Sequence, residues 1–230
     1  LPRIGSLGAS GDLAPLSHMA LALIGEGEVW TADGPAPTSK VLTENGLIGL
    51  ELSAKDGLSL INGTSQMCSF LSKSENLLSN LLPLADLIAC ASIEARECSI
   101  QPMDPRVHQA RPHHGQSLVA ERITSIMHNS EILASHADCD KVQDAYSFRC
   151  IPQVHGPVLE NYRKLCSTLD IEINSATDNP LIFPDPKNPG PNEVISQGNF
   201  HGEVLAISAD NMAHSLFELA HISERRIDQM

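Results

Sequence analysis

The feature that most constrains the fold is a single long segment, Ser65 to Glu97, in which apolar residues recur at helical spacing. Its leucines and isoleucine stand at positions 77, 78, 81, 82, 84, 87 and 88, and this spacing predicts a broad apolar side on an α-helix. Pro83 lies inside the segment, where the loss of one backbone N–H predicts a bend. A helix this long and apolar needs other helices to cover it, so we expect a body of packed helices.

Helical periodicity also marks shorter stretches on both sides of this segment. It predicts helices at Leu13 to Glu26, Ala54 to Ile61, Arg106 to Ala134, Pro152 to Leu169 and Gly202 to Met230. A loop is expected through 32–37, and two short apolar runs at 181–183 and 193–196, separated by a Pro/Gly/Asn-rich turn, predict a β-hairpin. We therefore expect a mainly α fold, a helical bundle of long packed helices with a small β-hairpin insertion.

Composition excludes some classes of partner. Hydrophobic residues make up 42% of the chain and charged residues 19%, and both fractions are ordinary for a soluble globular protein. Aromatic residues make up only 3%. The core must then consist largely of Leu, Ile, Ala and Val, a mixture that suits packed helices. The formal net charge of −13 argues against nucleic acid and against an anionic membrane surface, because both need clustered Lys and Arg.

Cysteine usage and hydropathy bear on location. The six cysteines, at positions 68, 90, 98, 139, 150 and 166, form no C-x-x-C pair and no disulfide framework, which indicates reduced thiols in a cytoplasmic protein. No apolar run is expected to span a bilayer. The sequence shows no signal peptide. Because Leu1 is not an initiator methionine, we expect the protein to have residues upstream of it.

The strongest chemical signal is Ala9-Ser10-Gly11, a run of small residues just before a predicted helix. Because Gly11 has no Cβ, its amide nitrogen can approach the carbonyl carbon of Ala9. Ring closure between these atoms, with loss of the Ser10 hydroxyl as water, would leave a methylidene-imidazolone, a carbon electrophile that no side chain supplies. The competing interpretation is an ordinary helix start, with Ser10 or Asp12 as the N-cap and Pro15 in the first turn.

Three further polar segments are candidates for a site. Asn62 follows a predicted helix end, and the segment 196–203 leads from the predicted hairpin into the last helix. Gln143, Tyr146 and Arg149 are spaced three apart, which predicts that they share one side of a helical turn. Such a group could hold a small zwitterion, with Arg149 binding a carboxylate through two bonds. Taken singly, the segments at Asn62 and at 143–149 favour simpler interpretations, an Asn-Gly turn and a polar contact between helices, and the segment 196–203 is also compatible with a helix cap.

Together these segments resemble the aromatic amino acid ammonia-lyase family. The matching strings occur in the family's order across the whole chain: GASGDLAPLSH (8–18), LINGT (60–64), VQDAYSFRCIPQVHG (142–156), NSATDNPLIF (174–183), GNFHGE (198–203) and ISERRI (222–227). One such string is weak evidence, whereas six in register are specific. The form Asn-Phe-His-Gly-Glu at 199–203 is closer to the members that act on histidine than to those that act on phenylalanine or tyrosine.

The resemblance implies a prosthetic group that the chain makes itself. This is a 4-methylidene-imidazol-5-one formed autocatalytically from Ala9, Ser10 and Gly11, with Asp12 assisting its formation and with no metal or nucleotide. The implied activity is that of a carbon–nitrogen lyase of histidine catabolism, which eliminates ammonia from L-histidine without oxidation and gives urocanate.

The resemblance also implies roles for the other polar residues. Asn62 and Tyr146 are implied as catalytic residues that hydrogen-bond the prosthetic ring and the substrate amine. Gln143 is implied as their neighbour in this network, Arg149 as the group that binds the substrate carboxylate, and Phe200 as the aromatic residue beside the electrophile.

Members of this family are longer than this chain. The resemblance therefore implies that residues 1–230 are the central helical part of a lyase, beginning just before the prosthetic-group tripeptide, with the flanking N- and C-terminal parts absent. Those parts would carry a loop tyrosine that acts as the base, the residues that select the substrate ring, and a further glutamate. The resemblance also implies a homotetramer with shared active sites. We expect little or no turnover from the isolated chain.

Other interpretations stay open on sequence grounds. A lyase or aminomutase acting on tyrosine or phenylalanine would carry similar motifs, and a non-catalytic helical assembly fragment could retain them as scaffold. Intact mass separates the last of these, because a cyclised tripeptide is two water molecules lighter than the encoded chain. A metal hydrolase is disfavoured, since His108, His113 and His114 lack an H-E-x-x-H arrangement and are expected to be exposed.

Overall fold

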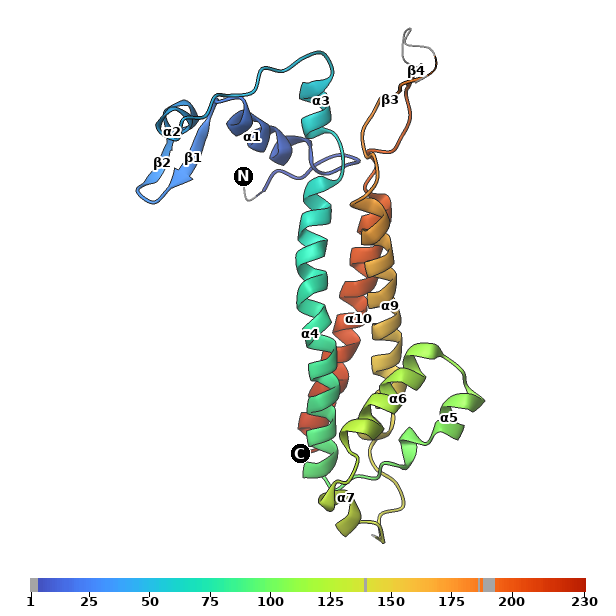
Figure 1. Ribbon diagram of the computed structural model, residues 1–230. Coiled ribbons are helices and arrows are strands. Elements are labelled where there is room, and N and C mark those ends of the chain that lie inside the picture. The colour runs from blue at the N-terminus through green and yellow to red at the C-terminus, as the bar shows by residue number, and fades with distance from the viewer. Residues whose placement is uncertain (1–3, 139, 186, 188–192) are drawn as a thin grey trace. The chain divides into compact units, whose positions relative to one another are not determined.

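The computed structural model describes residues 4–138, 140–185, 187 and 193–230. The described chain is mainly helical and carries two small antiparallel hairpins, which confirms the predicted fold class (Figure 1). It divides into two compact units. The first unit comprises Leu1–Leu71 and Leu169–Ala206, and the second comprises Ser72–Thr168 and Ile207–Met230.

The first unit contains short elements before the first long helix. In chain order these are α1 (Leu13–Leu23), β1 (Glu28–Thr31), β2 (Gly34–Pro37), α2 (Thr38–Glu44) and α3 (Asp56–Ile61). Helix α1 packs against α3, and α2 packs against the β1–β2 hairpin. Helices α1 and α3 fall within the predicted ranges, whereas α2 was not predicted.

The β1–β2 hairpin replaces the loop expected at 32–37. Its strands pair in antiparallel register up to Thr31 opposite Gly34, which adopts a φ of +112°. The Oγ1 of Thr31 accepts the N–H of Asp33 at 3.2 Å and donates to the carbonyl of Gly34 at 2.8 Å, which stabilises the turn. The sequence Gly-Pro-Ala-Pro did not predict a strand, because proline is depleted in strands and is tolerated mainly at sheet edges.

The second hairpin was predicted. Strands β3 (Leu181–Phe183) and β4 (Glu193–Ile195) pair antiparallel, with Leu181 opposite Ile195. Of the turn expected between them, residues 186 and 188–192 lie outside the described residues.

Three long helices have most of their length in the second unit: α4 (Ser65–Ala95), α9 (Ile151–Glu172) and α10 (Glu203–Asp228). Between α4 and α9 lie η1 (Gln101–Met103), α5 (Pro105–Ala110), α6 (His114–Ile126), α7 (Glu131–Ser135) and α8 (Tyr146–Arg149), as Figure 1 shows for the larger of these. The single helix predicted at 106–134 is therefore three helices. Pro112 ends the first of them by disfavouring helical backbone at the residue before it, and Asn129, with a φ of +63°, ends the second.

Polar contacts tie α4, α9 and α10 together within the second unit. The Tyr162 hydroxyl on α9 donates to Glu75 on α4 at 2.6 Å, and the Asn161 amide donates to Ser215 on α10 at 2.7 Å. Apolar side chains fill the space between helices, and those with at most 8% exposure include Leu78, Leu82, Ile93, Val119, Ile123, Ile151, Val158, Leu165, Met212 and Leu219. As expected from the composition, this core has few aromatic residues.

Helices α6 and α9 meet at a pair of glycines. A Cβ added to Gly115 would lie 2.3 Å from the carbonyl oxygen of Gly156, and one added to Gly156 would lie 2.5 Å from the backbone nitrogen of Gln116. The backbone N–H of Gly115 also donates to Glu160 on α9 at 2.8 Å. No side chain fits at this crossing, so the backbones themselves set the distance between the two helices.

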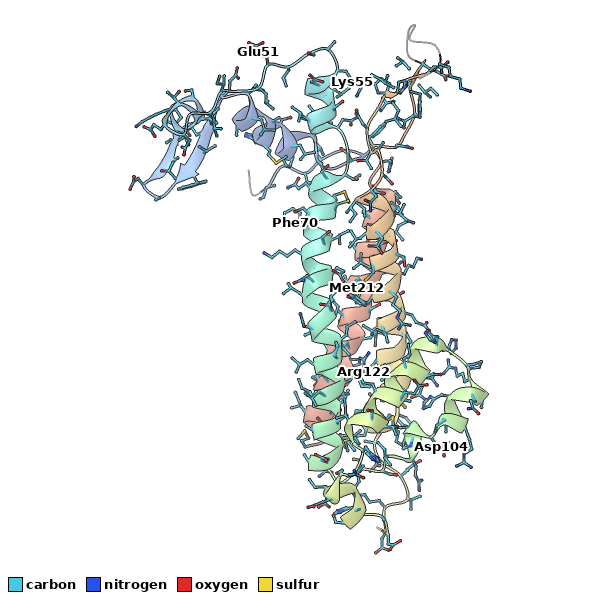
Figure 2. All side chains as sticks on the ribbon, viewed as in Figure 1. Glu51, Lys55, Phe70, Asp104, Arg122 and Met212 are labelled. Atoms are coloured by element: carbon cyan, nitrogen blue, oxygen red, sulfur yellow. The ribbon has the colours of Figure 1, made fainter. Side chains whose placement is uncertain are left out.

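A charged cluster is buried in the second unit. The carboxylate of Asp86, on α4, accepts hydrogen bonds from Arg122 on α6 at 2.5 Å and from His155 Nδ1 on α9 at 2.6 Å (Arg122 is labelled in Figure 2). On the other side of the ring, Arg226 of α10 lies 3.4 Å from His155 Nε2. Asp86, His155 and Arg226 are each at most 4% exposed. Burial lowers the pKa of Arg226, and the nearby Asp86 charge opposes that change.

One segment differs from the expectation that no part of the chain could span a bilayer. Asp56–Ala95 contains a window with a mean hydropathy of 1.4, which is long and apolar enough by composition alone. A core helix of a soluble protein passes the same test. In this structure 39% of that window is buried, and length and composition alone are weak evidence for a membrane span.

No disulfide joins the described cysteines, which are Cys68, Cys90, Cys98, Cys150 and Cys166. Cys139 lies outside the described residues. Burial raises the pKa of the Cys90 thiol to about 11, which makes it a poor nucleophile.

Candidate functional site

The Ala9-Ser10-Gly11 tripeptide forms a tight turn in the first unit. Gly11 adopts a φ of +77°, in the left-handed region that favours glycine, and a Cβ there would lie 2.8 Å from Ser6 Oγ. Ser10 is only 4% exposed, and its Oγ accepts the N–H of Asp12 at 3.3 Å. The turn therefore combines a buried hydroxyl with a backbone that only glycine adopts without strain.

The start of α10 lies directly against this turn. The backbone N–H of Gly202 donates to the carbonyl oxygen of Ala9 at 2.8 Å. A Cβ on Gly202 would lie 2.7 Å from Met67 Sδ and 3.3 Å from the carbonyl oxygen of Ser10. Gly202 thus lets two backbones approach closely, and its N–H polarises the carbonyl that a ring-closing nitrogen would attack. These features fit the methylidene-imidazolone that the sequence implies.

Asp12 does not cap its own helix. It occupies the N-cap position of α1 without a side-chain capping bond there. Instead its Oδ2 accepts the backbone N–H groups of Gln66 at 2.8 Å and Met67 at 3.1 Å, in the first turn of α4. Burial raises the pKa of the Asp12 carboxyl, and these two N–H groups partly oppose that change. Asp12 therefore connects the tripeptide to the long helix α4.

Asn62 follows the last residue of α3, as predicted, and its amide nitrogen donates to Asp178 at 3.1 Å. The following Gly63 has a φ of +146°, and a Cβ there would lie 2.4 Å from the carbonyl oxygen of Thr177. Phe200 is half-buried in the turn before α10, where the N–H of His201 donates to the carbonyl of Gly198 at 3.0 Å.

Gln143, Tyr146 and Arg149 belong to the second unit. Helix α8 begins at Tyr146, so the prediction that all three share one helical turn is wrong for Gln143, which precedes the helix. Arg149 Nε donates to the carbonyl of Asp144 at 2.6 Å, and the guanidinium lies 4.8 Å from the centre of the Tyr146 ring. The bond from Arg149 to the Asp144 carbonyl holds α8 against the segment before it. Helical spacing alone does not predict this contact.

Gln143 and Arg149 both line a cavity of about 700 Å³ in the second unit. Its lining also includes Lys141 and His136, together with the acidic residues Glu97 and Asp144. His136 pairs with the Glu97 carboxylate, and Lys141 donates to the Glu97 carbonyl oxygen at 3.1 Å. A cavity of this size can accept a small molecule, and Arg149 in its wall is the residue type that binds a carboxylate through two bonds.

The structure gathers Ala9, Ser10, Gly11, Asp12, Asn62 and Phe200 in the first unit and Gln143, Tyr146 and Arg149 in the second. Sequence reasoning assigned no role to Gly202, Met67 or Asp178, which contact the first group. Gly202 and Asp178 both lie inside the matching strings GNFHGE and NSATDNPLIF. Their presence in these strings is the sequence signal that could have identified them. Among the described residues, no three His, Cys, Asp or Glu side chains could hold a metal ion, and His113 and His114 are exposed while His108 is buried.

The sequence model described as "Aromatic amino acid lyase" matches residues 1–230. The chain belongs to the aromatic amino acid lyase family.

Individual relatives agree with this assignment. The chain is 45% identical over 230 residues to a histidine ammonia-lyase of Sorangium cellulosum. The alignment covers 100% of this chain and 45% of that protein. A histidine ammonia-lyase structure from Trypanosoma cruzi aligns with a TM-score of 0.84 and 40% identity, over 99% of this chain and 42% of that one. A tyrosine aminomutase structure from Streptomyces globisporus aligns with a TM-score of 0.86 and 36% identity, over 99% and 46%. The chain thus spans less than half the length of these relatives.

Proposed function

We propose that this chain carries the electrophile-forming region of a histidine ammonia-lyase, which eliminates ammonia from L-histidine and gives urocanate. The observation that carries the proposal is the turn at Ala9-Ser10-Gly11, where Gly11 has a φ of +77° and Gly202 donates to the Ala9 carbonyl. The 45% identity to a histidine ammonia-lyase supports histidine as the substrate.

The proposed maturation uses only atoms of the chain. The Gly11 nitrogen bonds to the Ala9 carbonyl carbon, and the Ala9 oxygen leaves as water with the hydrogens of the Gly11 and Ser10 amides. The Ser10 hydroxyl then leaves as a second water with the hydrogen on the Ser10 Cα, which creates the exocyclic double bond. The Gly202 N–H, 2.8 Å from the Ala9 oxygen, is placed to stabilise negative charge that develops on this oxygen during attack. Asp12, whose pKa is raised by burial, is the nearest acid–base group in sequence that can move these protons.

The finished ring supplies an electrophilic carbon for the substrate amine. In this proposal Asn62 and Tyr146 hydrogen-bond the substrate amine and the ring. Arg149 binds the substrate carboxylate, with Gln143 beside it in the same cavity wall. Phe200 packs against the reacting group. Fixing the substrate at its carboxylate positions the β-carbon for loss of hydrogen, so part of the barrier is removed by orientation.

The coverage of about 45% of a relative's length supports the proposal that residues 1–230 are the central part of a longer lyase. We infer that the base and the residues selecting the substrate ring lie in other parts, and that the chain alone shows little turnover. Leu77, Leu81, Leu84 and Ile88 form a stripe on α4 that is 45–64% exposed, and it supports assembly of several copies, as in a homotetramer with shared active sites. We infer a cytoplasmic location, and the reduced state of the described cysteines, which form no disulfide with one another, supports it.

A second candidate is an aminomutase acting on tyrosine or a related aromatic amino acid. The observation that favours it is the 0.86 TM-score of the tyrosine aminomutase structure, which is slightly above the 0.84 of the histidine ammonia-lyase structure. Incubation of the full-length protein with histidine and, separately, with tyrosine or phenylalanine distinguishes the two, because a lyase releases ammonia whereas an aminomutase returns a β-amino acid.

The experiment that tests the main proposal measures intact mass and urocanate formation in the full-length protein. The unmodified sequence should be two water molecules lighter than encoded and should form urocanate from histidine. Ser10→Ala should have the full encoded mass, apart from the substitution, and should form no urocanate. A Ser10→Ala protein with unchanged urocanate production would contradict the proposal, and so would an active unmodified protein with an uncyclised mass.

A further inference from the structure

The side chain of Asn62 is held by its amide nitrogen. Nδ2 donates to Asp178 Oδ1 at 3.1 Å and to the backbone carbonyl of Asn179 at 3.4 Å. A carboxylate and a carbonyl can only accept hydrogen bonds, so the nitrogen of the amide must face them. Both amide hydrogens of Asn62 are thereby used, and Oδ1 is the group that remains for another partner.

Asp178 is itself fixed from several sides. Its Oδ2 accepts from Ser59 at 3.0 Å and forms an ion pair with Lys55, and its Oδ1 accepts the N–H of Asn179 at 2.7 Å. The Lys55 and Asp178 side chains are only 20% and 18% exposed. Lys55 stands just before α3 (Figure 2), with a φ of +79° that is uncommon for a residue other than glycine.

The charge state of Asp178 suits this role. Burial by itself would raise the pKa of the Asp178 carboxyl, but the hydrogen bonds from Lys55, Asn179 and Asn62 together lower it from its usual range. The group is therefore a carboxylate at neutral pH and offers no hydrogen for donation. An orientation with the Asn62 oxygen toward Asp178 would place two acceptors against each other, so the reverse orientation of the amide is excluded.

Backbone packing holds the two segments at this distance. Gly63 lies so close to Thr177 that a Cβ on it would meet both the carbonyl oxygen at 2.4 Å and Oγ1 at 2.9 Å. On the other side, the Gln197 amide donates to the Asp178 carbonyl at 2.7 Å. The pair of Asn62 and Asp178 is thus part of a closely packed and hydrogen-bonded arrangement instead of a chance surface contact.

We propose that Asp178 is a positioning residue that orients the Asn62 amide, so that Asn62 meets the substrate as a hydrogen-bond acceptor through Oδ1. The proposal rests on the proposed function, because it deepens the role of Asn62 in that site. The chemical class that an oriented amide oxygen recognises is a protonated or neutral amine, which donates hydrogens. Loss of Asp178 would free the amide to rotate, and orientations that present hydrogens to a group that also donates would then become populated.

The test is a cycle of variants in the full-length protein, assayed for urocanate formation. We expect Asp178→Ala to lower kcat/KM for histidine by about tenfold, the equivalent of one well-placed hydrogen bond. The double variant Asp178→Ala with Asn62→Ala should be no worse than Asn62→Ala alone, because Asp178 acts through Asn62. Asp178→Asn should retain more activity than Asp178→Ala, since its own amide oxygen can accept from Asn62. Effects that multiply in the double variant would overturn the proposal.

Matched controls separate orientation from stability. Ser59→Ala removes another hydrogen bond to the same carboxylate without touching Asn62, and Asp33→Ala removes an exposed carboxylate in the β1–β2 turn; both should change kcat/KM less than twofold. All variants should still lose two water molecules on maturation. An Asp178→Ala protein that loses activity only by failing to mature would contradict a positioning role.

A second readout does not depend on turnover. In a Ser10→Ala background, which cannot form the ring, calorimetry measures histidine binding directly. We expect the added change Asp178→Ala to weaken binding by about tenfold and a further Asn62→Ala to weaken it no more. Unchanged binding after Asp178→Ala would overturn the proposal. Failure of the proposed function looks different, because the unsubstituted protein would then form no urocanate and retain its full encoded mass.

Discussion

The backbone N–H of Gly202 donates a hydrogen bond to the carbonyl oxygen of Ala9 across 2.8 Å, although 193 positions separate the two residues in the chain (202 − 9). The bond joins the start of a long helix to the residue whose carbonyl carbon would be attacked in ring closure. Positive potential at a helix start favours negative charge, so this contact can assist that step.

Replacement of Gly202 by alanine tests this contact. The new Cβ would lie 2.7 Å from Met67 Sδ and 3.3 Å from the Ser10 carbonyl oxygen, so the Met67 side chain must shift and the contact between α10 and the tripeptide must lengthen by a few tenths of an ångström. We expect most Gly202→Ala protein to keep both water molecules, as measured by intact mass, with a stability loss of about 1–3 kcal/mol.

Two controls belong to that prediction. Gly198→Ala should mature normally, because a Cβ at Gly198 meets nothing within 4 Å. Adding Met67→Ala to Gly202→Ala should restore part of the ring formation by making room. Normal maturation of Gly202→Ala would show that the contact is dispensable.

Asp12 should give the protein a specific pH dependence. Its pKa is raised by burial above the ordinary value of 3.8, so between these two values the folded state binds more protons than the unfolded state. The stabilising contribution of this group is therefore complete below pH 3.8 and is lost as pH rises through the raised pKa. Urea unfolding across this range should show that slope in the unsubstituted protein and a flatter curve in Asp12→Asn.

The capping role of Asp12 makes a separate prediction. Asp12→Asn keeps an oxygen that can accept the N–H groups of Gln66 and Met67, whereas Asp12→Ala leaves both without it. We expect Asp12→Ala to lower the free energy of unfolding by about 1 kcal/mol relative to Asp12→Asn, as judged from denaturant midpoints. Equal stability of the two variants would argue against capping of α4.

The glycine pair between α6 and α9 predicts a packing defect. A Cβ at Gly156 would lie 2.5 Å from the backbone nitrogen of Gln116, where no flexible side chain can yield. Gly156→Ala should cost about 1–3 kcal/mol by thermal or chemical unfolding. Gly57→Ala inside α3 is the matched control, because its Cβ meets only Leu52 Cδ1 at 3.8 Å; this change should be neutral or stabilising.

The buried cluster around Asp86 predicts a large loss of stability. Asp86→Ala removes the carboxylate that faces Arg122 and His155 and leaves the Arg226 guanidinium, only 2% exposed, without a nearby negative charge. We expect a loss of about 3–5 kcal/mol in the free energy of unfolding. Glu44→Ala, which breaks the exposed ion pair with Lys40, should change the midpoint little. A small effect at Asp86 would mean that water solvates the cluster.

The long helices could be predicted from the sequence because their periodicity is strong and extends over many turns. The helix predicted at 106–134 divides at Pro112 and Asn129, since local backbone preference there outweighs the apolar spacing. The β1–β2 hairpin was missed because its turn is stabilised by side-chain bonds of Thr31, whereas its prolines suggest a loop.

The candidate site was predictable as a set of residues but not as a set of contacts. The motif strings identified Asn62 and Asp12, yet the partner of Asn62 is Asp178, and the partners of Asp12 are backbone groups of α4. These pairs join distant positions, and no local spacing rule encodes them. The same reason explains the error at Gln143, whose neighbour Asp144 binds Arg149 through its carbonyl outside any helix.

The cluster of Asp86, Arg122, His155 and Arg226 draws one residue from each of four helices. A core made only of leucine and isoleucine tolerates a helix that slides along its neighbours, because one methyl group can substitute for another. A buried carboxylate tolerates no such displacement, since a shift of one turn would leave charges without partners. The cluster therefore selects a single longitudinal alignment of α4, α6, α9 and α10 during folding.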